Sequence, residues 1–174
     1  RHLGLVLPEE IPELKSRLQK LSEVLEKTLD IDGILELAGE APELAAPETE
    51  MLIQKDTAFG YRTEEKVRIG VADDEAFCFF YADNLNLLEQ MGAELVRFSP
   101  IHDRELPEDL DGLLLSGGYP ELNGEALEEN QEMCTRIREA IRDGMPCLAE
   151  CGGFMYLHQE MEDMEGKQRR VCGV

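Results

Sequence analysis

The chain has 174 residues, of which 38 are acidic and 17 basic, giving a formal net charge of −21. This acidic excess argues against nucleic acid and anionic membranes as partners, because both select for clustered lysine and arginine. No run approaches the ~20 apolar residues that a membrane-spanning helix needs, and no charged-then-apolar leader opens the chain, so we expect a cytoplasmic protein.

Both ends of the sequence fall in unusual places. Arg1–Leu7 has the pattern of the end of a strand without an initiator methionine, and Lys167–Val174 stops without a terminating signal. We therefore expect a piece of a longer protein. The sequence pattern predicts three segments: a helical segment at 1–38, a linker at 39–65 and an α/β domain at 66–174 that is incomplete at its carboxy-terminal end.

The helical segment predicts two amphipathic helices. Apolar side chains recur at spacings of three and four at Ile11, Leu14, Leu18, Leu21, Leu25 and Leu29, and Pro12 suits the first turn. Asp32 is predicted to cap a second, short helix that carries Ile34, Leu35 and Leu37. Beyond it the apolar period fails, which is typical of a linker.

The rest of the chain alternates between strands and helices. Apolar runs predict strands at 67–72, 94–98 and 111–116, and apolar spacing predicts helices at 84–91 and 125–142, followed by Gly92 and Gly144 as stops. Strands separated by helix-length crossovers imply right-handed βαβ units. We therefore predict a doubly wound, mostly parallel sheet with helices on both faces.

A thiol stands at the corner that follows the last predicted strand. The run Met145–Leu157 predicts strand, sharp turn and helix, with Cys151 at the turn and two glycines after it. The five cysteines lack C-x-x-C spacing, which disfavours a disulfide framework and any metal site. Cys78, Cys134 and Cys147 are interpreted as small core residues.

Three loops are predicted to meet at the carboxyl edge of the sheet, where ligands collect in such folds. They are 73–82, 117–121 and the corner at 151–152. The first carries an aromatic cluster, Phe77, Phe79, Phe80 and Tyr81, which is equally compatible with a roof over the sheet and with the lining of a substrate face.

Four runs in this order resemble the cobyrinic acid a,c-diamide synthase family. They are Asp74–Leu85, Ser99–Asp103, Ser116–Leu122 and Ala149–Leu157. Members of that family join an ATP-dependent synthetase domain to a class I glutamine amidotransferase domain. The resemblance, which spans about 67–157, implies a flavodoxin- or Rossmann-like three-layer amidotransferase domain, and it makes 1–38 the carboxy-terminal remnant of the synthetase domain.

The resemblance also implies roles for individual residues. Cys151 would be the nucleophile that forms a thioester with glutamine, and the backbone N–H groups of Gly118 and Gly152 would form the oxyanion hole. Gly117, Tyr119 and Tyr81 would lie on the glutamine side of the site. The product would be a corrin dicarboxamide of cobalamin biosynthesis, although cobyrinic acid, hydrogenobyrinic acid and nickel sirohydrochlorin are equally compatible substrates.

The parts that the family needs beyond this chain are a His followed two residues later by a Glu, and a phosphate-binding loop. Neither a downstream His-x-Glu nor a G-x-x-x-x-G-K-[ST] loop occurs here, and His2, His102 and His158 do not suit the catalytic position. ATP and Mg²⁺ are therefore assigned to a missing domain. We predict that the isolated chain has little or no glutaminase activity.

Two other classes stay open on the sequence alone. One is a different cysteine hydrolase on a similar sheet, although such enzymes place a histidine directly after the nucleophile, where this chain has Gly152. The other is a non-catalytic scaffold or interaction fragment. An exposed sheet edge would also permit a homodimer.

Overall fold

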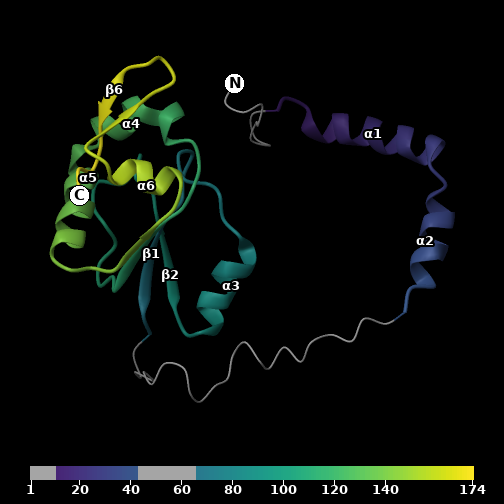
Figure 1. Cartoon of the computed structure of the whole chain (residues 1–174), viewed down its shortest axis with the longest axis horizontal. Coiled ribbons are helices and arrows are strands. Elements are labelled where there is room, and N and C mark those ends of the chain that lie inside the picture. Colours follow the sequence, from purple (N-terminus) through teal and green to yellow (C-terminus); the bar gives the residue numbers. More distant parts are fainter. Residues whose placement is uncertain (1–10, 43–65) are drawn as a thin grey trace. The chain divides into compact units, whose positions relative to one another are not determined.

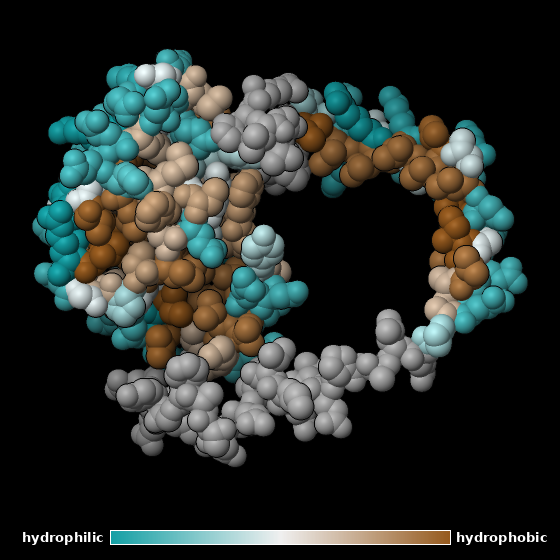
Figure 2. All heavy atoms as spheres, in the orientation of Figure 1, coloured by the Kyte–Doolittle hydropathy of each residue, from teal (hydrophilic) through white to brown (hydrophobic). Residues whose placement is uncertain are grey.

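The computed structural model describes residues 11–42 and 66–174, and the chain divides into two compact units, Arg1–Leu52 and Ile53–Val174. The first unit contains α1 (Leu14–Thr28) and α2 (Ile31–Gly39), which confirms the two predicted helices. Neither helix buries a residue. Figure 2 shows their apolar side chains gathered along both helices.

The cap predicted for the second helix is wrong by two residues. Asp30, not Asp32, caps α2, and its Oδ1 accepts a hydrogen bond of 3.0 Å from the N–H of Gly33. Asp30 directly precedes the first helical residue, so its short side chain reaches the third N–H of the helix. Asp32 lies inside the first turn, where its charge instead complements the helix dipole.

The second unit is built on a four-stranded parallel sheet (Figure 1). Its strands, in the order β2-β1-β3-β4, are β2 (Glu94–Phe98), β1 (Arg68–Ala72), β3 (Gly112–Leu115) and β4 (Cys147–Ala149). All three neighbouring pairs are parallel, which confirms the predicted sheet. The carboxyl ends of β1, β3 and β4 therefore lie at one edge.

Helices cover both faces of the sheet, as predicted. On one face, Leu113 and Leu115 of β3 join the core with α5 (Gln131–Arg142) and α6 (Gly152–Leu157). The core also includes the buried side chains of Phe77, Phe98, Leu127, Met133, Ile137 and Tyr156. On the other face, α3 (Ala82–Gln90) lies over the alternate residues of β3 and β4. Burial of apolar side chains on this scale is the main favourable term in folding.

The long helix predicted at 125–142 is two helices. α4 (Gly124–Glu129) ends at Asn130, and α5 begins after it. The side-chain Oδ1 of Asn130 accepts a hydrogen bond from the N–H of Met133, while its Nδ2 donates to the backbone carbonyls of Pro100 (2.8 Å) and Asp103 (2.7 Å). A buried side chain that bonds to a distant loop thus interrupts the helix at a single residue. A short 3₁₀ helix, η4 (Pro120–Asn123), precedes α4.

A β-hairpin follows α6, and the sequence did not predict it. It consists of β5 (Glu160–Glu162) and β6 (Gln168–Arg170), which pair antiparallel. Its anchor is Arg169, which is 6% exposed and forms ion pairs with Asp163 (2.6 Å) and Glu128 (3.1 Å). A hairpin held by a buried arginine lacks the apolar alternation that identifies strands in a sequence.

Within the described ranges 11–42 and 66–174, no helix has the length and apolarity to cross a bilayer.

Candidate active site

Cys151 stands at a strained corner between β4 and α6. Its backbone has φ 49° and ψ −113°, and its thiol is exposed. Non-glycine residues rarely adopt positive φ, and such strain is found where a fold holds a reactive side chain in place. The predicted strand, turn and helix around this thiol are confirmed, and the corner has the geometry of a nucleophile elbow.

The two glycines after Cys151 allow α6 to approach the sheet closely. A Cβ on Gly153 would lie 2.0 Å from the carbonyl oxygen of Leu115, and one on Gly152 would lie 2.8 Å from Cδ of Pro120. The N–H of Gly153 donates to the carbonyls of Ser116 (3.0 Å) and Glu150 (2.9 Å). Because only hydrogen atoms fit here, the Gly-Gly pair sets the position of the corner against β3.

The turn after β3 lies against the same corner. A Cβ on Gly117 would lie 3.4 Å from Cβ of Cys151, and one on Gly152 would lie 3.2 Å from the backbone nitrogen of Gly118. The carbonyl of Gly117 also accepts hydrogen bonds from the N–H groups of Cys78 and Phe79. The predicted meeting of three loops at this edge is therefore confirmed.

The aromatic cluster divides between the two roles that the sequence left open. Phe77 is fully buried and packs on Tyr156, with ring centroids 5.2 Å apart. Phe79, Phe80 and Tyr81 instead line a cavity of about 270 Å³ between the sheet and α3. Part of the cluster thus belongs to the core, and part faces the space beside the corner.

The two tyrosines that the sequence placed near glutamine lie in different surroundings. Tyr119, in the glycine turn, is buried and contacts the edge of Phe79, with centroids 5.1 Å apart. Tyr81, at the start of α3, is 75% exposed. Tyr119 is therefore held in place beside Gly118, whereas most of the Tyr81 side chain faces solvent.

Two polar residues of this cavity were missed by sequence reasoning. Ser116 directly follows β3 and Glu150 directly follows β4, and both residues line the cavity with Phe79. The hydroxyl of Ser116 is buried without a hydrogen-bond partner among the described residues. An unsatisfied buried hydroxyl typically costs about 1–3 kcal/mol. The available signal was their position, one residue before the glycine turn and one before the thiol.

No histidine in the described part of the chain bonds to the Cys151 thiol. His102 is exposed and its Nε2 lies 3.0 Å from Glu75, which raises the pKa of His102. His158 directly follows α6, and its ring packs edge-to-face with that of Phe154, with ring centroids 4.9 Å apart. His2 lies outside the described residues.

The other cysteines differ from Cys151 in exposure. Cys134 and Cys172 are fully buried, while Cys78 and Cys147 are half-buried. Burial raises the pKa of the Cys172 and Cys147 thiols, so both stay protonated at neutral pH. The core interpretation is confirmed in full for Cys134 and in part for Cys78 and Cys147.

The parallel sheet, the strained thiol corner and the facing glycine turn belong to one α/β domain. Residues 68–174 match the CobB/CobQ-like glutamine amidotransferase domain, and the chain belongs to that family. This agrees with the resemblance found in the sequence motifs.

Three curated relatives are each named cobyrinate a,c-diamide synthase. The protein of Caldanaerobacter subterraneus subsp. tengcongensis is 40% identical over all of this chain and 36% of the relative. A protein of Dehalococcoides mccartyi is 42% identical over the same shares. That of Methanosarcina acetivorans is 46% identical over 92% of this chain and 33% of the relative. The chain thus spans about a third of the length of these relatives.

Proposed function

We propose that this chain is the glutaminase portion of an ATP-dependent cobyrinate a,c-diamide synthase. The exposed thiol of Cys151, mounted on a strained corner against the Gly117-Gly118 turn, is the observation that carries the proposal. The domain family supports glutamine as the nitrogen source, and the name of the relatives supports a corrin acceptor.

In the proposed reaction, the Cys151 thiolate attacks the side-chain amide carbon of glutamine. The N–H groups of Gly152 and Gly118 donate to the oxygen as it becomes negative, and loss of one such donor typically lowers the rate about 100- to 1000-fold. The C–N bond then breaks, the nitrogen takes up a proton and leaves as ammonia, and a thioester remains on Cys151. Water hydrolyses this thioester to glutamate and restores the thiol.

On this proposal Gly117, Tyr119 and Tyr81 lie on the glutamine side of the site. The exposed Tyr81 ring would contact a bound amino acid from the solvent side, whereas the buried Tyr119 holds the turn. A base that relays the proton is also needed. We assign it to sequence outside this chain, so the isolated chain is expected to be nearly inactive.

ATP and Mg²⁺ do not fit the residues of this chain, which contains no G-x-x-x-x-G-K-[ST] loop. We therefore assign both to the synthetase part of the longer protein. We assign binding of the corrin substrate to the synthetase part too, and that part would select which tetrapyrrole is amidated. Cytoplasmic location and homodimer formation stay predictions.

The proposal is tested by treating the chain with a diazoketone analogue of glutamine and locating the adduct by mass spectrometry. We expect selective modification of Cys151 and none in Cys151→Ala. A neutral haloacetamide of similar size serves as the control for simple accessibility. Equal labelling of several cysteines, or no preference for the glutamine analogue over the haloacetamide, would favour the interaction-fragment alternative.

The expected inactivity has a separate test. Purified chain should release no more ammonia from glutamine than Cys151→Ala does. Appreciable ammonia release that disappears in Cys151→Ala would contradict the expectation and would show that a base is present after all.

A further inference from the structure

Three arginines gather around one cavity beside α5. Arg138 and Arg142 come from α5 and Arg170 from the end of β6, and they line a space of about 300 Å³ together with Gln131 and Gln159. None of the residues of the thiol corner or the glycine turn lines this cavity. It is therefore a separate feature of the domain.

These arginines lack acidic partners. No carboxylate of the described residues lies within 4.0 Å of the three guanidinium groups, whereas the other arginines between residues 66 and 174 all form ion pairs: Arg68, Arg97, Arg104, Arg136 and Arg169. The chain carries 38 acidic residues against 17 basic ones. In so acidic a protein, three unpaired arginines at one cavity mark a local reversal of charge.

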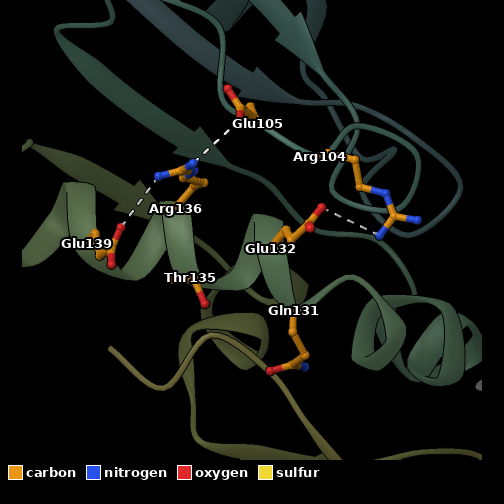
Figure 3. A pocket seen from close by; sticks show the side chains of 7 residues that line it. All are labelled: Arg104, Glu105, Gln131, Glu132, Thr135, Arg136 and Glu139. Carbon is orange, nitrogen blue, oxygen red and sulfur yellow. Dashed lines mark hydrogen bonds and ion pairs between the residues drawn. The ribbon is translucent and has the colours of Figure 1, made fainter.

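A second cavity beside α5 shows the usual arrangement. It has a volume of about 490 Å³ and also contains two arginines (Figure 3). There Arg136 lies between Glu105 (3.4 Å) and Glu139 (3.9 Å), and Arg104 lies 3.9 Å from Glu132. Its positive charges are paired with carboxylates of the protein itself.

Neutral acceptors fix two of the three unpaired guanidinium groups. Arg138 donates to the carbonyl of Cys172 (2.8 Å) and to the hydroxyl of Thr135 (3.1 Å), and Arg142 donates to the carbonyl of Gly173 (3.0 Å). These bonds position the side chains without removing their charge. Each guanidinium has five N–H donors, so most remain available.

We propose that this cavity binds an anion of the phosphate class, either free phosphate or a phosphoryl group on a small molecule. Three positive charges match a multivalent anion better than a carboxylate, which would neutralise only one of them. The guanidinium fork also suits the several oxygens of a phosphate, which accept paired hydrogen bonds. A cavity of about 300 Å³ leaves room for more than the phosphoryl group itself.

The test is calorimetric titration of the 174-residue chain with inorganic phosphate and, in a second series, with adenosine monophosphate. Low ionic strength is used because salt screens exposed charges. We expect saturable binding with a Kd of about 1 mM or tighter. Tighter binding of the nucleotide would identify a phosphoryl group on a small molecule as the ligand, and equal binding would identify free phosphate.

The variants separate a site from a general charge effect. Arg142→Gln and Arg170→Gln should each weaken binding about tenfold, a change of about 1.4 kcal/mol. Arg104→Gln removes one positive charge from the cavity of Figure 3 and should leave anion binding unchanged. Thermal unfolding of each variant checks that the fold is intact.

Two results would overturn the proposal: no saturable binding of either ligand, or equal weakening by all three substitutions. Cys151→Ala should bind phosphate as the unaltered chain does. The anion site and the glutaminase therefore stand or fall independently.

Discussion

The two halves of the sheet's carboxyl edge are built on different physical principles. Beside β3 and β4, segments pack so closely that Gly118, Gly152 and Gly153 leave no room for a Cβ. Beside β1 and β2, the carboxylate of Asp74 joins the loops through four hydrogen bonds. Shape therefore holds the thiol corner, and polar bonding holds the opposite half.

Asp74 joins the loops that follow β1 and β2. Its Oδ1 accepts from the N–H groups of Ala76 (2.9 Å) and Phe77 (3.2 Å), and its Oδ2 accepts from the Ser99 hydroxyl (2.8 Å) and the Ile101 N–H (2.9 Å). The halves also touch, because a Cβ on Gly118 would lie 2.0 Å from the carbonyl oxygen of Ala76. The polar half thereby supports the loop on which the glycine turn rests.

The largest effect is expected from adding a methyl group to the shape-determined half. Gly153→Ala would place its Cβ 2.0 Å from the Leu115 carbonyl oxygen, so backbone must move. We expect the free energy of unfolding in urea to fall by more than about 3 kcal/mol, at the level of severe overpacking.

The matched control is Gly39→Ala in α2, where an added Cβ meets nothing within 4 Å. Alanine favours a helix over glycine by up to about 1 kcal/mol, so this variant should be neutral or slightly stabilised. A loss below about 1 kcal/mol for Gly153→Ala would mean that shape does not hold the corner.

A smaller loss is expected when the polar half is opened. Asp74→Ala removes the acceptor of four hydrogen bonds, and we expect the unfolding free energy to fall by about 2–4 kcal/mol, since bonds to charged groups are among the stronger ones. Asp74→Asn keeps one acceptor oxygen and should lose about half as much. Urea unfolding measures both.

Asp73→Ala is the control for the two Asp74 variants. Asp73 is the neighbour of Asp74 in the sequence, and its side chain forms an ion pair at the surface with Arg97. Such pairs contribute about 0–1 kcal/mol. If Asp74→Ala and Asp73→Ala proved equal, the network around Asp74 would not be the organising feature of this half.

The smallest effect concerns the exposed pair of Glu75 and His102. Glu75 raises the pKa of His102 through a hydrogen bond and its charge. A histidine whose pKa is raised by folding contributes stability below its ordinary pKa of about 6.5, and loses it as the pH rises through the folded value. Glu75→Gln should return the pKa toward 6.5, with little change in stability.

Proton NMR of the His102 ring during a pH titration measures this shift. Glu108→Gln removes an exposed carboxylate that does not contribute to the raised pKa of His102, so it should leave the midpoint where it was. An unchanged midpoint in Glu75→Gln would show that the 3.0 Å contact does not persist in solution.

Local sequence patterns were sufficient for most of the sheet and for the thiol corner. β2 has the predicted bounds, β1 is one residue shorter than predicted at its start, and β3 is one residue shorter at each end. Gly92 and Gly144 both have positive φ at helix ends. These features depend on apolar runs and on backbone conformations that glycine alone adopts readily. The meeting of the loops followed from chain order in a parallel sheet.

Contacts between distant residues account for what the sequence did not predict. The helix break at Asn130 depends on carbonyls 27 and 30 residues away, and the β5–β6 hairpin depends on Arg169 reaching Glu128. The unpartnered hydroxyl of Ser116 is likewise a property of packing. Residue patterns carry no record of such partners until the fold brings them together.

The strand order β2-β1-β3-β4 also sets the order in which the corner can be assembled during synthesis on the ribosome. β1 and β2 can pair as soon as residue 98 has emerged, at translation rates of about 5–20 residues per second. β3 then adds on the free side of β1, and β4 adds last. We therefore expect Cys151 to adopt its strained conformation only after β1, β2 and β3 have paired. A nascent chain would not hold the thiol in that conformation before these strands support it.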